Sequence, residues 1–390
     1  MNHAKKTSTY ILSRILSVVF VTLVLTPTLW ANSVIFQANL EGTGVYDDTG
    51  PEEPPELVWK FDAESPVIST PLVYEGIVYF IDMEGQIYAI NEEDGSLAWD
   101  RELGGQPSFQ ITVDEDILLV GLSFFDDSTP SYLLALNRIS GDELWRFYTD
   151  NQIGLDSPAI YNKKLYFTLM SDYVISLDIN TGKELWRLPI SGGSGQPLIS
   201  EDTLYLQDDS QTLYAISLDD KNENWRKSSQ GLSLGEIIHP SLNDCCIFTI
   251  RNNDTSGFIT KRNKHTGELE AEFKIEYPSV SSISLSGDIA FFGDEGEGHA
   301  GAHGYMNAMD TGSGELVWRF ETGGFVRGAA SIAGGTVYFG SHDHYMYAVD
   351  RHTGEMKWRY ETGAGIASTP AIVDGRLYFG SIDGHVYVLE

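Results

Sequence analysis

The sequence predicts an all-β protein, an eight-bladed β-propeller built of four-stranded antiparallel blades. A Gly followed four residues later by Trp recurs along the chain, and its Trp position returns every 39 to 47 residues, which is the length of a propeller blade. Within each interval, short alternating runs are separated by Asp-Gly and similar turns, a pattern typical of β-hairpins. Helical periodicity is absent beyond the N-terminal segment.

The N-terminal residues 1–31 have the features of an export signal. A basic head containing Lys5, Lys6 and Arg14 precedes an apolar run, and a small-residue cleavage site follows after Ala31. An uncleaved membrane anchor is the alternative, although the run is short for a membrane span. No cysteine lies near the cleavage site, so we expect a periplasmic or secreted chain without a lipid anchor or a further transmembrane segment.

Residues 32–56 are irregular in pattern and rich in Pro, Asp and Glu, so the sequence predicts an acidic flexible linker. The whole chain has a formal net charge of -31. Such a surface repels phosphate groups, so nucleic acid and anionic membranes are not expected partners.

The repeats predict a propeller over residues 57–390. Seven tryptophans occupy its Trp positions: Trp59, Trp99, Trp145, Trp186, Trp225, Trp318 and Trp358. In the remaining repeat, the Trp position after Gly267 holds Ala271. Large aromatic side chains usually serve packing when they are buried, so we expect these tryptophans to dock one blade on the next.

The last repeat ends at Glu390 before its fourth strand, while the strand 57–62 with Trp59 precedes the first complete repeat. A closed ring accounts for both features, because the N-terminal strand 57–62 then completes the C-terminal blade and hides its open edge.

The repeats YFGSHDHYMYAVDRHTGEMKW and YFGSIDGHVYVLE, together with SLDINTGKELW, resemble the PQQ-like (quinoprotein-type) β-propeller repeat family. This group includes quinoprotein dehydrogenases and the BamB-like scaffolds of outer-membrane assembly, and the resemblance is greatest to the latter. It implies a non-enzymatic, monomeric scaffold of the bacterial cell envelope that binds envelope proteins through its rim loops. The matched residues hold blades together, so the resemblance supports the fold more directly than the function.

The alternative is a PQQ-dependent oxidoreductase, or a degenerate quinone- or metal-binding propeller. Such an enzyme would need an indole platform under the cofactor and ligands for calcium. All seven tryptophans of the propeller occupy docking positions, so we expect no cofactor and assign no catalytic or cofactor-binding residue.

Cys245 and Cys246 are adjacent and are the two cysteines of the chain. Their Cα atoms lie closer together than in an ordinary disulfide, which favours two thiols, whereas an oxidising compartment favours a bridge. An adjacent pair is similar to the vicinal disulfide of alcohol-oxidising quinoproteins. The repeat alignment places this pair at the turn between the first and second strands of a blade, on the rim opposite the loops expected to carry function.

Four histidines cluster in the corresponding loops of two neighbouring repeats, and carboxylates accompany them: His299, His303, His342 and His344, with Asp294, Glu295, Glu297 and Asp343. Imidazole and carboxylate are competent metal ligands. The spacing matches no zinc motif, and solvated loop histidines explain the pattern equally well, so these residues are candidates only.

The long connection after Trp225 displays Leu232 and Leu234 beside glycines. BamB-like proteins present a Leu-Ser-Leu-Arg stretch to their barrel-assembly partner, and the resemblance therefore implies partner binding by Leu232 and Leu234. Here Gly235 follows instead of Arg. Leucines packed against the propeller are the alternative.

Overall fold

The computed structural model describes most of the chain from residue 37 onward. The described ranges are 37–124, 129–149, 157–169, 173–191, 195–208, 210–228, 239–253, 256–279, 281–296 and 303–390. These residues form β-strands and turns and contain no α-helix. Accordingly, no helix in the described ranges is long and apolar enough to cross a membrane.

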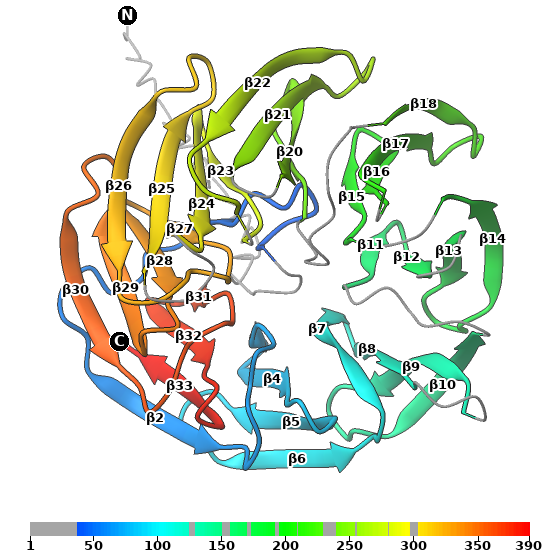
Figure 1. Cartoon of the computed structure of the whole chain (residues 1–390). Coiled ribbons are helices and arrows are strands. Elements are labelled where there is room, and N and C mark those ends of the chain that lie inside the picture. Colours follow the sequence, from blue (N-terminus) through cyan, green and yellow to red (C-terminus); the bar gives the residue numbers. More distant parts are fainter. Residues whose placement is uncertain are drawn as a thin grey trace, which may run out of the picture. The chain divides into compact units, whose positions relative to one another are not determined.

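The strands form eight sheets arranged as successive blades of a ring, confirming the predicted fold (Figure 1). In each blade the strands are called A to D from the centre outward. Blades one to four are β3 (Leu72–Tyr74), β4 (Ile77–Ile81), β5 (Gln86–Asn91), β6 (Leu97–Glu102); β7 (Gln106–Asp114), β8 (Ile117–Ser123), β9 (Ser131–Asn137), β10 (Glu143–Thr149); β11 (Ala159–Tyr161), β12 (Lys164–Leu169), β13 (Tyr173–Asp178), β14 (Glu184–Pro189); β15 (Leu198–Ser200), β16 (Thr203–Gln207), β17 (Thr212–Ser217), β18 (Glu223–Ser228).

The remaining blades follow the same order and antiparallel pairing. Blades five to eight are β19 (Ser241–Leu242), β20 (Cys246–Asn252), β21 (Gly257–Asn263), β22 (Leu269–Ile275); β23 (Ser284–Ser286), β24 (Ile289–Asp294), β25 (Gly304–Asp310), β26 (Leu316–Thr322); β27 (Ser331–Ala333), β28 (Thr336–Gly340), β29 (Tyr345–Asp350), β30 (Met356–Glu361); β31 (Ala371–Val373), β32 (Arg376–Gly380), β33 (His385–Leu389), β2 (Leu57–Asp62).

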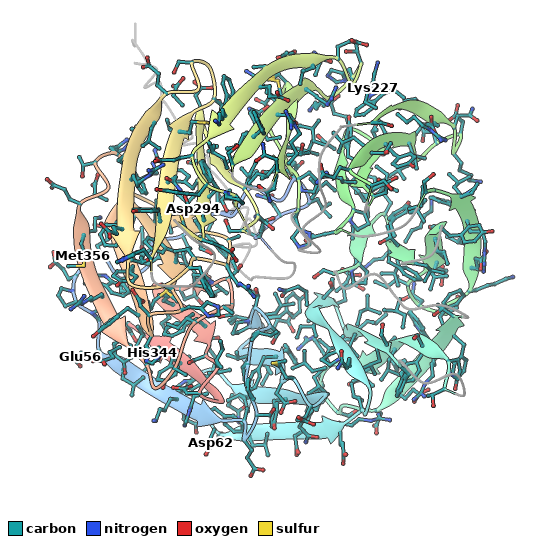
Figure 2. All side chains as sticks on the ribbon, viewed as in Figure 1. Glu56, Asp62, Lys227, Asp294, His344 and Met356 are labelled. Carbon is teal, nitrogen blue, oxygen red and sulfur yellow. A yellow bond between two sulfur atoms is a disulfide. The ribbon has the colours of Figure 1, made fainter. Side chains whose placement is uncertain are left out.

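The ring is closed by β2, as the sequence predicted. β2 pairs antiparallel with β33, and Trp59 lies opposite Val388. Backbone hydrogen bonds of 2.9 and 3.0 Å join Glu56 and Glu390 in both directions. Figure 2 shows Glu56 and Asp62, at the two ends of this strand, at the outer edge of the ring.

The core lies between the blades. The buried apolar side chains form eight clusters in the described residues, and each cluster combines strands of two neighbouring blades. The cluster containing Trp59 and Val388 joins blade eight to Val78 and Ile90 of blade one. Strands B and C are therefore buried on both faces, which explains why their sequences are nearly continuous apolar runs.

The repeated glycine and tryptophan meet across the blade interfaces. A Cβ on Gly95 of blade one would lie 2.8 Å from the ring of Trp59, which belongs to blade eight. The glycine thus leaves room for the indole of the preceding blade. Where blade five has Ala271 in the Trp position, Phe273 packs against Gly314 of blade six instead.

The N-terminal segment corrects part of the linker prediction. Of residues 32–56, the structure describes 37–56, and these are bonded to the propeller rather than free. β1 (Val45–Tyr46) pairs in parallel with β27, and the buried Gln37 side chain donates to the carbonyl of Ile283 at 2.9 Å. Residues 37–56 contact the propeller largely through backbone groups, and the composition of a segment does not reveal such contacts.

Candidate functional site

The rim formed by the B–C turns and D–A connections of blades six and seven contains the candidate histidines. The His342 ring lies 4.5 Å from the Phe325 ring, centroid to centroid, and its backbone N–H donates to the Phe325 carbonyl. The Arg327 guanidinium lies 5.1 Å from the Phe325 ring centroid and 3.6 Å from Glu295. Blades six and seven thus share one polar and aromatic patch, and the sequence indicated only its histidine and glutamate.

Burial, with a smaller contribution from Arg327, lowers the pKa of His342 below its ordinary value. This imidazole is therefore neutral near pH 7. Its Nε2 atom is buried and has no hydrogen-bond partner in the described part of the chain. The ring could accept a hydrogen bond from a ligand or bind a metal ion through this atom.

Of the other candidate histidines, the two that the structure describes, His303 and His344, do not join His342 in one site. His303 is exposed, and its Nδ1 lies 3.3 Å from Glu321 Oε1. His344 is exposed on a turn with φ of 77°. His299, like Glu297, lies outside the described residues.

The carboxylates near these histidines hold loops in place. Asp343 accepts hydrogen bonds from the Gly323 N–H at 2.7 Å and the Tyr347 hydroxyl at 2.8 Å. Asp383 of blade eight makes the same two contacts, with Gly363 and Tyr387. The contacts of Asp343 therefore belong to the repeat rather than to a special site.

Asp294 is 2% exposed on β24 and accepts hydrogen bonds from the Asn307 amide and the Gly296 N–H. Burial raises the pKa of Asp294 to about 6, against the opposing effect of these hydrogen bonds. Asn307 connects it to Arg319, whose Nε donates to the Asn307 amide oxygen at 2.9 Å.

Within the described ranges, no group of three or more His, Cys, Asp or Glu side chains is arranged to hold a metal ion. Metal binding by the four histidines stays a prediction, because His299 lies outside those ranges. Zinc or cobalt titration of the wild type against a His299→Ala, His303→Ala double variant tests it, and identical isotherms without binding would contradict it.

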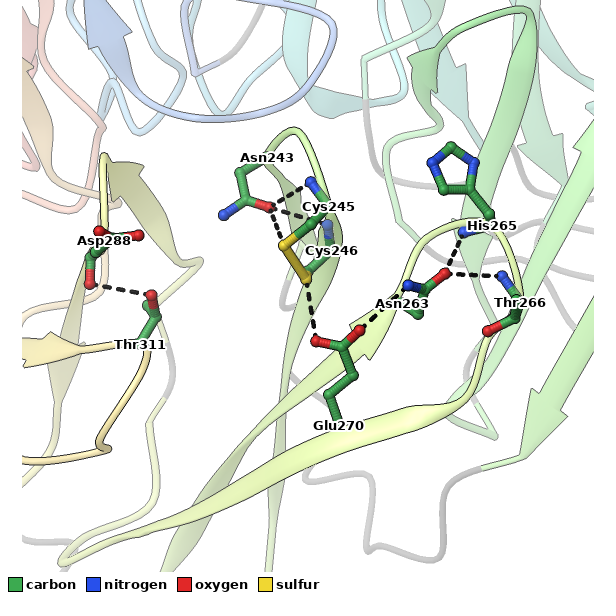
Figure 3. The surroundings of a disulfide bond; sticks show 9 residues. All are labelled: Asn243, Cys245, Cys246, Asn263, His265, Thr266, Glu270, Asp288 and Thr311. Carbon is green, nitrogen blue, oxygen red and sulfur yellow. Dashed lines mark hydrogen bonds between the residues drawn. A yellow bond between two sulfur atoms is a disulfide. The ribbon is translucent and has the colours of Figure 1, made fainter.

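Cys245 and Cys246 form a disulfide, so the bridge rather than the thiol pair is present (Figure 3). The pair lies at the turn between β19 and β20, as the repeat alignment predicted. The Asn243 side-chain oxygen accepts both cysteine N–H groups, at 3.1 and 2.9 Å. These contacts fix the turn locally, and the adjacency of the two residues alone did not indicate them.

All seven tryptophans of the propeller pack at blade interfaces. Six of them donate the indole N–H to a backbone carbonyl across an interface, at 2.7 to 3.0 Å: Trp59 to Glu92, Trp99 to Arg138, Trp145 to Ile179, Trp225 to Lys264, Trp318 to Arg351 and Trp358 to Pro51. Trp186 packs in the cluster between blades three and four. None of the seven extends from the described rim as a platform for a planar cofactor.

The predicted partner-binding residues Leu232 and Leu234 lie outside the described residues. The connection that contains them follows β18, the D strand of blade four, and leads to β19 of blade five. Their role in partner binding therefore stays a prediction.

Comparison with known protein families gives one match that covers most of the chain. The family model described as outer membrane protein assembly factor BamB matches residues 31–227, 129–291 and 302–390. These ranges include seven blades completely and all of blade six except residues 292–301.

A characterised relative is the outer membrane protein assembly factor BamB of Salmonella typhimurium, 29% identical over 171 residues. The match covers 43% of this chain and 40% of the relative, so the chain spans less than half of that protein's length in the alignment. BamB of Moranella endobia is 24% identical over 257 residues, covering 63% of this chain and 64% of the relative.

Solved structures show the same fold at low sequence identity. BamB from Moraxella catarrhalis has a TM-score of 0.67 at 18% identity, covering 86% of this chain and 97% of its own. A europium-containing methanol dehydrogenase has a TM-score of 0.72 at 13% identity, covering 92% and 98%. The fold is therefore shared by scaffold and enzyme, and does not by itself distinguish them.

Proposed function

The chain belongs to the family of the outer membrane protein assembly factor BamB, and on this basis we propose that it is an exported, non-enzymatic propeller that acts as a protein–protein interaction scaffold in outer-membrane assembly. The observation that carries the proposal is the position of the tryptophans of the propeller. All seven in the propeller pack between blades. A rigid ring that presents loops at its rims is suited to protein recognition.

The proposed partners are envelope proteins that contact the B–C and D–A rim. The patch of Phe325, Arg327 and His342 lies on this rim, and the connection containing Leu232 and Leu234 is another candidate contact. Aromatic and arginine side chains are frequent centres of protein interfaces. The net charge of -31 favours partners with a basic surface.

Cross-linking in living cells tests the proposal. A photoreactive residue replaces Arg327, which is exposed on the rim, and a second replaces Met356, which is 50% exposed on the outer edge. We expect the first position to capture an outer-membrane assembly protein, identified by mass spectrometry, and the second to capture it much less. Capture of no envelope protein above background from the rim would contradict the scaffold proposal.

The second candidate is a PQQ-dependent oxidoreductase, which the fold of the methanol dehydrogenase and the disulfide of Cys245 and Cys246 favour. The disulfide lies at an A–B turn, at the opposite end of the blade from the B–C rim. Titration of the purified protein with PQQ and calcium separates the two functions. Fluorescence quenching with dye reduction by alcohols would support the enzyme, and the scaffold predicts neither.

A further inference from the structure

Residues 40–44 run along the inner edges of four consecutive blades, which face the centre of the ring (Figure 1). Their carbonyl groups accept backbone N–H groups at 2.8 to 3.0 Å: Leu40 from Ile199, Glu41 from Leu242, Thr43 from Leu285 and Gly44 from Ile332. Blades four to seven therefore already bind a peptide at their A strands through its carbonyl groups, and that peptide is the protein's own N-terminal segment, in which Gly42 and Gly44 have φ of 63° and 68°.

The other four blades present the same donor. In each of these four A strands the last residue but one is the one whose N–H points away from strand B, because the residues on either side of it form the hydrogen-bonded pairs. By register these residues are Val73, Val113, Ile160 and Ile372. Their N–H groups have no hydrogen-bond partner within the described part of the chain. An unpaired strand edge is a ready template for pairing with another peptide.

Two of these edges open into a cavity of about 380 Å³. Its lining combines one side of the N-terminal segment with the A strands of blades two and three: Ala38, Asn39, Leu40, Glu41, Thr112, Val113, Asp114 and Ile160. Val113 and Ile160, whose N–H groups have no partner among the described residues, therefore border this cavity beside the peptide that occupies the equivalent edges.

Residues 40–44 show which residue types a peptide needs in order to pair with the inner edge of a blade. A Cβ on Gly44 would lie 2.6 Å from Ser284 Oγ and 2.7 Å from the Ala330 carbonyl, both closer than real Cβ contacts. Gly42 is similarly close to Leu198, at 3.0 Å. A peptide that pairs with the inner edge in this way must therefore contain glycine where it crosses a blade, and both glycines also have a positive φ that favours glycine.

The charges at the cavity favour a neutral or basic occupant. Asp114 is paired with Lys163 at 3.0 Å, whereas the half-buried Glu41 has no ion-pair partner in the described ranges. A basic side chain beside Glu41 would gain a favourable charge interaction, and an acidic one would be repelled.

We propose that the inner edges of blades two and three bind a glycine-containing segment of a partner protein that carries neutral or basic side chains. Its carbonyl groups accept the N–H groups of Val113 and Ile160, continuing the arrangement that residues 40–44 begin. This site is independent of the proposed rim interface.

A synthetic peptide copying residues 38–46, with Glu41→Lys, serves as the probe for the full-length protein. We expect saturable binding, measured by fluorescence anisotropy, and slower amide hydrogen exchange at Val113 and Ile160 in the bound wild-type protein. The same peptide with alanine in place of both glycines should bind at least about 5-fold more weakly, because its Cβ atoms cannot approach the edge.

Ile160→Pro removes one free N–H without removing a ladder hydrogen bond. We expect it to weaken binding about 5-fold, the effect of one net hydrogen bond. Ile372→Pro is the matched control, because its N–H is equally free but does not border the cavity. Absence of binding at millimolar peptide, binding without protection of Val113 and Ile160, or equal affinities of the two proline variants would each overturn the proposal. The exchange measurement on the wild type needs neither variant to fold.

Discussion

Trp358 donates its indole N–H to the carbonyl of Pro51 at 2.7 Å, across 307 positions of sequence. In the five other interfaces where a tryptophan makes this bond, the acceptor lies on the C–D turn of the next blade, as with Trp318 and Arg351. Blade eight has no continuous C–D turn, because its C strand ends at Leu389 and its D strand begins at Leu57. Pro51 supplies the missing acceptor, and it also accepts the Tyr338 hydroxyl.

Deleting residues 37–53 while retaining β2 should lower the free energy of unfolding by at least about 3 kcal/mol. The deletion removes the acceptor of Trp358 and those of four A strands, and each lost hydrogen bond is worth about 1 kcal/mol. Urea unfolding of the shortened and full-length proteins measures the difference. An unchanged unfolding midpoint would show that these residues contribute nothing to the ring.

Trp59→Ala should destabilise the protein by about 3–5 kcal/mol, the usual cost of truncating a buried aromatic residue. Trp59 is 8% exposed and packs between blades eight and one. Met356→Ala is the control, because Met356 is 50% exposed and surface substitutions change stability by about 0.5 kcal/mol or less. Equal unfolding midpoints for the two variants would contradict the closure by β2.

The free energy of unfolding should fall as the pH rises through the pKa of Asp294. Its pKa is about 6 in the folded chain and about 3.9 when unfolded, so the folded state binds more protons between these values and the free energy of unfolding falls across that range. Asp294→Asn removes the titration. Between pH 5 and pH 7.5, the stability of the wild type relative to this variant should fall by about 1 kcal/mol. Parallel stability curves would contradict the raised pKa.

His344→Gly should stabilise the protein by about 0.5–1 kcal/mol. His344 has a φ of 77°, and the equivalent residue of blade eight is Gly384 with a φ of 83°. A side chain at such a φ is strained, and relief of that strain exceeds the entropy cost of glycine. Gly384→His is the reciprocal variant and should destabilise by a similar amount. Thermal unfolding compares them, and a loss of stability in His344→Gly would refute the strain.

The closure of the ring was predictable from the count of strands. A D strand at 57–62 precedes the first complete repeat, and the last repeat lacks a D strand. The positions of residues 37–51 were not predictable. Gly42 and Gly44 fit because they lack a side chain, and Pro51 binds through its backbone carbonyl. Contacts of these two kinds leave no alternating pattern in the sequence. The acidic, proline-containing composition therefore resembled that of a free linker.

The candidate site was predictable only in part. Sequence placed His342 and Glu295 on neighbouring blades, but Phe325 and Arg327 lie on a D–A connection without a recognisable motif. The contacts that orient Cys245 and Cys246 come from Asn243, whose side chain accepts both N–H groups. Such contacts depend on the conformation of a turn, which the identity of the two cysteines does not specify.

The most direct measurement of the pairing between the N-terminal segment and the inner edges of blades four to seven is amide hydrogen exchange at one residue of each A strand: Ile199, Leu242, Leu285 and Ile332. In the full-length protein these amides should be protected, because residues 40–44 accept their N–H groups. Deleting residues 37–53 should expose all four to exchange while the B and C strands remain protected. Equal protection of the four amides with and without the segment would contradict this pairing.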